Sequence, residues 1–117
     1  MKKKINSRAK GAAAEREAAQ WLRDRGIAAR RGQQFSGIGE SPDVVADLPG
    51  VHLEIKRVEN LSLYPAMAQA KRDAKNGASP TVFHRRNGEE WLVIMRAEDW
   101  LALFKKAQGI VGLELLD

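Results

Sequence analysis

The sequence predicts one α/β domain spanning residues 1–117, in which helices cover a mixed central β-sheet. Two observations predict this architecture. Segments rich in helix formers alternate with short apolar strands in the order helix, strands, helix, strands, helix. The strands form two pairs, and each pair surrounds a glycine-containing turn signal, Pro49-Gly50 in the first and Asn87-Gly88 in the second. A chain of this length is typical of a single domain.

The first element is a helix over residues 7–25, "SRAKGAAAEREAAQWLRDR", because alanine and other helix formers dominate it. Ser7 is the candidate N-cap and Gly26 the stop signal. A short extended segment, 27–31, follows. The glycine- and serine-rich stretch 32–42 is then expected to be a loop.

The middle of the chain predicts a hairpin followed by a helix. Residues 43–46 and 51–58 flank "DLPG", whose Pro-Gly pair marks a turn, so these two strands are expected to pair with each other. The segment 64–77, "YPAMAQAKRDAKNG", is predicted to be a helix with Pro65 at its first position and its closing glycine just beyond its end.

The last third predicts a second hairpin and a final helix. Strands 81–86 and 90–95 surround an Asn-Gly turn, the strongest short hairpin signal. Residues 97–107, "AEDWLALFKKA", form an amphipathic helix. The apolar tail 109–117 is either an added strand or a surface for a partner.

Charge and composition narrow the partners. The net charge is +5, and residues 1–31 alone hold ten Lys or Arg against three acids, which favours a polyanionic partner and nucleic acid before membrane. No apolar run is long enough to span a membrane, and no signal-peptide segment follows the basic start. The protein is therefore expected in the cytoplasm. There is no cysteine, and the two histidines lack metal-site spacing, so no zinc site is expected.

The strand "VHLEIKR" carries charge on one face. Alternation places His52, Glu54 and Lys56 together, opposite the apolar side chains. Such a face is either an idle, solvated surface or a site. Asp43 favours a site, because the predicted hairpin brings it beside Glu54, and two close carboxylates repel unless a cation or proton intervenes. Carboxylate oxygens with open positions suit Mg²⁺, and Lys56 would assist phosphodiester hydrolysis beside it.

Glu15 is a carboxylate in an apolar stripe. In the first helix it shares a face with small and apolar residues at spacings of three and four. A buried carboxylate must be paired or bound to a metal. The alternatives are a metal ligand, an ion pair with a neighbouring arginine, or a helix rotated so that Glu15 lies at its edge.

Two sets of residues resemble known nucleases. Pro42-Asp43 with Glu54-Ile55-Lys56 resembles the PD-(D/E)xK nuclease motif. The opening helix resembles the start of archaeal-type Holliday junction resolvases, including phage versions, over Lys10-Gly11, Glu15-Arg16, Gly26-Ile27 and Arg31. The resemblance covers residues 8–95.

The resemblance implies a restriction-endonuclease-like fold and a metal-dependent endonuclease that cuts four-way DNA junctions symmetrically as a homodimer. Mg²⁺ is the implied cofactor, with Mn²⁺ a plausible substitute. It further implies a catalytic set and a DNA-binding set. The catalytic residues are Glu15, Asp43 and Glu54 as metal ligands, with Lys56 and Gln69. The resemblance assigns Arg16 and Arg31 to DNA binding, with Arg30 as a substitute for Arg31. The basic start of the chain adds four expected DNA-binding residues, Lys3, Lys4, Arg8 and Lys10.

Three alternatives stay open at this point. The chain could be another nuclease of the same fold acting on flaps, nicks or single strands, or a DNA-binding module without chemistry. Gln69 could be an ordinary surface glutamine. Among the aromatic residues, Trp21, Trp91 and Trp100 are expected in the core, whereas Tyr64 and Phe35 are candidates for stacking on a junction but fit structural roles better. The last helix and the tail are the expected dimer surface.

Overall fold

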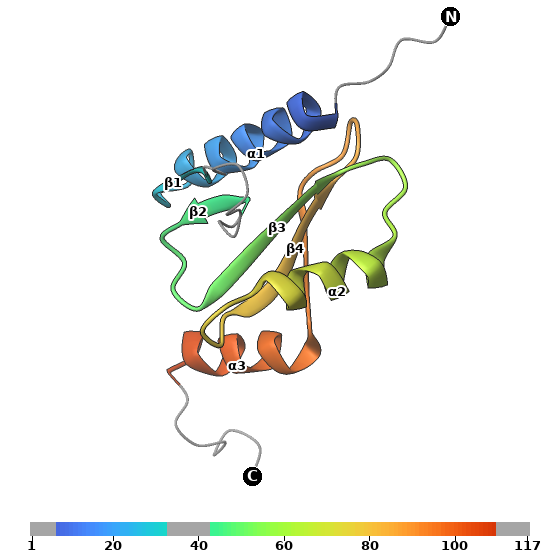
Figure 1. Ribbon diagram of the computed structural model, residues 1–117. Helices are drawn as coiled ribbons and strands as arrows, with labels where there is room; N and C mark the ends of the chain where they lie inside the picture. Colours follow the sequence, from blue (N-terminus) through green and yellow to red (C-terminus); the bar gives the residue numbers. More distant parts are fainter. Residues whose placement is uncertain (1–6, 33–42, 110–117) are drawn as a thin grey trace, which may run out of the picture.

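The computed structural model describes residues 7–32 and 43–109. Within these ranges three helices and five strands follow one another, and Figure 1 shows how they are arranged. They are α1 (Ser7–Arg23), β1 (Ala29–Arg31), β2 (Val44–Ala46), β3 (Val51–Arg57), α2 (Leu63–Asp73), β4 (Ser79–Arg85), β5 (Leu92–Met95) and α3 (Ala97–Ala107). None of the helices in these ranges has the length and apolar character needed to cross a membrane.

The strands form two small sheets. β1 and β2 pair antiparallel, with Arg30 opposite Val45. β3 pairs parallel with β4, and β4 pairs antiparallel with β5 in the order β3-β4-β5. A parallel pair needs a crossover connection, and α2 supplies it. The mixed α/β architecture expected from the alternation of elements is therefore present.

One expected hairpin is wrong and the other is confirmed. β2 forms its ladder with β1 rather than with β3, although the Pro49-Gly50 turn between them is present and Gly50 has the positive φ of 80° that such a turn requires. The chain turns at this point but enters a different sheet. β4 and β5 do form the second hairpin, with Phe83 opposite Val93. Its connection is longer than the two residues of the Asn-Gly pair.

Two layers of side chains cover the faces of β3 and β4. One buried cluster joins the small residues of α1, among them Ala18 and Ala19, to Leu53, Ile55 and Phe83. The other joins Ala66 and Ala70 of α2 to Val82 of β4. Figure 1 shows α1 and α2 on opposite sides of the long β3 and β4 strands. Alanine on both helices lets the helix backbones approach the sheet closely, so helices cover both faces of β3.

The helix boundaries differ from expectation by a few residues. α1 ends at Arg23, two residues early, and Gly26 follows in the left-handed conformation as the expected stop. α2 begins at Leu63, which places Pro65 at its third position. Proline is tolerated there because the first-turn N–H groups have no partner within the helix. Trp21 and Trp91 pack against the core, but Trp100 is 57% exposed, so its expected burial is wrong.

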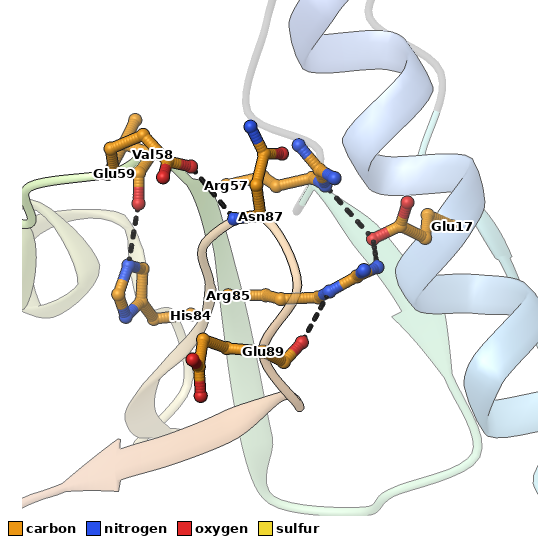
Figure 2. Close-up of polar contacts among 8 residues, drawn as sticks. All are labelled: Glu17, Arg57, Val58, Glu59, His84, Arg85, Asn87 and Glu89. Atoms are coloured by element: carbon orange, nitrogen blue, oxygen red, sulfur yellow. Dashed lines mark hydrogen bonds and ion pairs between the residues drawn. The ribbon is translucent and has the colours of Figure 1, made fainter.

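A glutamate ties α1 to the ends of two strands. Glu17 Oε1 accepts hydrogen bonds from Arg57 Nε of β3 at 3.2 Å and from Arg85 Nη1 of β4 (Figure 2). Arg85 Nε also donates to the carbonyl of Glu89 in the β4–β5 connection. All three charged side chains are partly buried, at 25–36% exposure. The Glu17 carboxylate therefore links α1 to β3 and β4, and Arg85 links the same group to the β4–β5 connection.

Replacing Glu17 by Ala should lower the free energy of unfolding by about 1–2 kcal/mol, because two charge-assisted hydrogen bonds are lost at a partly solvated site. Urea denaturation measures the change. Glu90→Ala, which removes an exposed glutamate from the adjoining turn, is the matched control and should be near neutral. Equal stability of the two variants would show that Glu17 does not tie these elements together.

Candidate active site

Asp43 and Glu54 meet although their strands do not pair. Asp43 lies immediately before β2, and its Oδ2 accepts a hydrogen bond from the backbone N–H of Ile55 at 2.9 Å. That bond attaches the carboxylate to β3 next to Glu54. The two acids interact both by charge and by a hydrogen bond between their side chains. The juxtaposition expected from the sequence is present, but a side-chain contact to β3 produces it instead of a hairpin ladder.

Glu54 is buried, which excludes the idle, solvated face. It is 3% exposed, and His52 beside it is 8% exposed, because α2 covers this side of β3. The pKa of Glu54 is raised from 4.5 to about 8. Burial is the largest cause of the rise, the charge of Asp43 contributes to it, and the Lys56 ammonium opposes it. A cation bound beside such a carboxyl group would strongly stabilise its ionised form.

Lys56 of β3 contacts α2 and also lies near Glu54 on its own strand. Its Nζ donates to Gln69 Oε1 at 2.9 Å and lies 3.9 Å from Glu54 Oε2. Gln69 thus contacts Lys56 directly and is not an ordinary surface residue. The amide oxygen can orient the ammonium group without neutralising its charge.

Glu15 takes part in an ion pair. Its Oε1 accepts from Arg31 Nε at 2.8 Å, and the Glu15 side chain is 17% exposed. Burial is the main cause of its raised pKa; Arg31 lowers the pKa, whereas the charge of Asp43 raises it. The pairing with arginine that the sequence left open is therefore present, and Glu15 lies near enough to Asp43 to sense its charge.

The ligand atoms that lie closest together belong to a partly different set. Within the part of the chain that the structure describes, His52, Glu54 and Asp73 each place a ligand atom within 4.8 Å of the others, whereas Glu15, Asp43 and Glu54 do not form such a group. His52 and Asp73 were not expected in any site. His52 shares a face with Glu54, so alternation could have included it, but Asp73 comes from the end of α2 and carries no local signal.

Basic residues surround a shallow pocket beside Lys56. The pocket has a volume of about 370 Å³ and joins the start of α1 to the end of β3. Lys10 and Gly11 line one wall, and Lys56 and Arg57 line the other. Arg57 was not among the expected DNA-binding residues. Three cations line this depression, and one of them, Lys56, also lies beside Glu54, so the pocket suits a phosphate.

The other expected DNA contacts are only partly described. Arg16 and Arg30 are exposed, and Arg31 is exposed although paired with Glu15. Lys3, Lys4 and Phe35, and the side chain of Arg8, lie outside the described residues. Tyr64 at the start of α2 is 84% exposed, so it does not contribute to the core.

Comparison with known proteins gives the family. A model of the archaeal Holliday junction resolvase (Hjc) family matches residues 6–108. The chain belongs to this family. The structure of Archaeoglobus fulgidus Hjc, a Holliday junction resolvase from an archaeal hyperthermophile, resembles the resolvase described here with a TM-score of 0.52 and 26% sequence identity, over 71% of this chain and 74% of that one. No curated protein sequence matches it.

Family membership confirms the resemblance drawn from the two sequence motifs, and the structural match confirms the fold class. A resolvase is a nuclease, so this resolvase is an enzyme of phosphodiester hydrolysis, and its family acts on branched DNA. The acidic residues around Glu54 provide donors for a metal ion.

The stability of the metal-free resolvase should fall as the pH rises from about 4.5 to about 8. In this window the folded chain keeps a proton on Glu54 that the unfolded chain has lost, so the unfolded state is favoured as protons become scarce. The stabilisation from the proton on Glu54 is complete below pH 4.5 and is lost as the pH rises through about 8. The free energy of unfolding should change by a few kcal/mol over this range.

Urea denaturation in EDTA across this pH window measures the effect. Glu54→Gln, which mimics the protonated carboxyl group, should remove most of the slope, and Glu90→Gln, at an exposed position, should retain it. A wild-type stability that is flat or rises between these pH values would contradict the burial of an uncompensated carboxyl group.

Proposed function

We propose that this protein is a Mg²⁺-dependent Holliday junction resolvase that cuts four-way DNA junctions symmetrically as a homodimer. The observation that carries the proposal is the Asp43–Glu54 carboxyl pair with Lys56 alongside, in a chain of the resolvase family. As an enzyme of DNA, it would work inside the cell.

The donor set fits a hard divalent cation. Asp43 and Glu54 bring two carboxylates together, and Glu15 lies near Asp43 as a third. Mg²⁺ favours carboxylate oxygens and keeps positions open for water and phosphate, and Mn²⁺ accepts the same ligands. When bound, such an ion polarises a phosphoryl oxygen and lowers the pKa of a bound water. For Glu15 to join this set, its carboxylate must be shared with Arg31 or released from it.

Lys56 acts on the reacting phosphate from beside the carboxylates, and Gln69 positions Lys56. The Lys56 ammonium group, oriented by Gln69 Oε1, offers a fixed positive charge where negative charge develops on the phosphate. Its 3.9 Å separation from Glu54 keeps it beside the carboxylates without a close ion pair. Gln69 is thus a positioning residue, and Lys56 is the group that contacts the phosphate or the attacking water.

The basic pocket would hold the DNA backbone beside this site. Lys10 and Arg57 flank Lys56 there, and Arg16, Arg30 and Arg31 extend the positive charge along α1 and β1. Lys3, Lys4 and Arg8 belong to the same basic end of the chain. Because these contacts replace counterions on phosphates, binding should weaken steeply as salt is raised.

An exposed apolar patch offers the surface for the homodimer. No described residue of α3 is buried, and its Trp100, Leu101, Leu103 and Phe104 are 44–57% exposed. Leu92 and Val93 of β5 are exposed in the same way. Large apolar side chains exposed in this number on a small domain indicate an interaction surface. Two symmetric cuts in one junction require two active sites related by a two-fold axis, which a homodimer supplies.

A substrate panel tests the proposal. Synthetic four-way junction, duplex, flap and single strand are each incubated with the wild-type protein in Mg²⁺ or EDTA. We expect paired nicks at symmetry-related positions in the junction, in Mg²⁺ alone, and little cutting of duplex. Preferential cutting of flaps or single strands would reassign the protein to another nuclease activity on the same fold. Tight junction binding without cutting in Mg²⁺ or Mn²⁺ would make it a binding module.

A further inference from the structure

The Nε2 atom of the His52 imidazole is buried without a hydrogen-bond partner. The residue is 8% exposed, and Nε2 has no partner among the described residues. A buried nitrogen left in this state costs about 1–3 kcal/mol, so native proteins rarely keep one without a use for it. The position of Nε2 indicates a ligand-binding role, because this nitrogen faces the carboxyl group of Glu54.

The spacing around Nε2 fits a metal ion better than a hydrogen bond. Nε2 lies 3.5 Å from Glu54 Oε1, beyond the range of a good N–H···O contact. Two ligands bound tetrahedrally at about 2.1 Å from one ion stand about 3.4 Å apart. Asp73, at the end of α2, completes a group whose three ligand atoms lie within 4.8 Å of one another.

We propose that His52, Glu54 and Asp73 form a site for a transition-metal dication such as Zn²⁺ or Mn²⁺, separate from the Mg²⁺ proposed beside Asp43. An imidazole nitrogen favours first-row transition metals over Mg²⁺. The two carboxylates balance the charge of the dication. Asp73 is exposed whereas His52 and Glu54 are buried, so the ion enters from the surface at the end of α2.

The site has a consequence for the nuclease. Glu54 belongs both to this group and to the proposed catalytic set, so it lies between the two cations. An ion held by His52 keeps Glu54 ionised and restricts its side chain. Metal binding alone tests the site formed by His52, Glu54 and Asp73, and the result does not depend on DNA cleavage.

Binding of Co²⁺ to the full chain, in saturating Mg²⁺, tests the site. Calorimetry gives the affinity, and visible absorption reports the coordination geometry of the bound Co²⁺. Asp73→Asn changes an exposed residue and should fold normally, and it should weaken Co²⁺ binding by at least about tenfold. Asp47→Asn, at another exposed aspartate, is the matched control and should bind as the wild type does. His52→Gln should abolish the absorption bands.

The outcomes separate this proposal from the nuclease assignment. Asp43→Asn should keep Co²⁺ binding while it loses Mg²⁺-dependent cutting. If the wild type shows no Co²⁺ binding in Mg²⁺, or if Asp73→Asn binds as tightly as Asp47→Asn, the proposed site is wrong and His52 simply pairs with Glu54. Junction cutting that persists alongside either result would leave the nuclease assignment intact.

Discussion

Asp43→Asn should lower the rate of junction cleavage by about 10³-fold or more while junction binding persists. The substitution removes a charged metal ligand, and metal-ion stabilisation of a phosphoryl transition state supplies several kcal/mol. Asn is chosen because its Oδ1 can still accept the Ile55 N–H, so the backbone contact at 2.9 Å is retained. Single-turnover cleavage and gel-shift binding measure the two effects.

Asp47→Asn provides the control for this prediction, because Asp47 is exposed and lies four residues along the chain. It should cut at the wild-type rate. A cleavage rate in Asp43→Asn within a few fold of the control would remove Asp43 from the catalytic set.

Trp100→Glu should convert the protein from a dimer to a monomer and abolish paired nicking. Trp100 stacks on Phe104 at a centroid distance of 5.9 Å, and both rings are about half exposed, so a charge there costs the isolated chain little. In a dimer that buries this patch, the same charge would be desolvated without a partner. Light scattering should give 13.0 kDa instead of twice that mass.

Tyr64→Glu is the matched control for the mass measurement, since Tyr64 is another exposed aromatic residue on a different helix. It should remain a dimer. If Trp100→Glu also remains a dimer, α3 is not the interface, and the apolar patch must serve a different partner.

Local signals predicted most of the elements but not which strands pair. The last helix matches its expected bounds, because residues 97–107 combine helix formers with a clear apolar stripe. The hairpin of β2 with β3 was wrong because a Pro-Gly turn specifies a reversal of the chain and nothing about the neighbouring strand. β2 pairs with the short β1 instead, and β3 takes its partner β4 through the α2 crossover.

In the candidate site too, the sequence predicted residues that are neighbours on one strand but not all of those that tertiary packing brings together. Alternation along the strand predicts that Glu54 and Lys56 share one face. The resemblance to known nucleases predicts Gln69, which contacts Lys56 from the packed α2 helix. Asp73 had no signal, because only the packing of α2 on β3 brings it beside His52. The burial of His52 was likewise hidden, since an alternating strand does not reveal that helices cover both of its faces.

Phosphorothioate substitution at the cleaved bond tests the central claim most directly, namely that Asp43 and Glu54 hold a divalent cation against the scissile phosphate. Sulfur replaces one non-bridging oxygen at the nicking position of a four-way junction. Mg²⁺ binds sulfur poorly, whereas Mn²⁺ accepts softer ligands. We expect slow cleavage in Mg²⁺ and recovery in Mn²⁺ for one of the two sulfur diastereomers. Equal cleavage of both diastereomers in Mg²⁺, at the rate of the unmodified junction, would contradict direct metal contact with that phosphate.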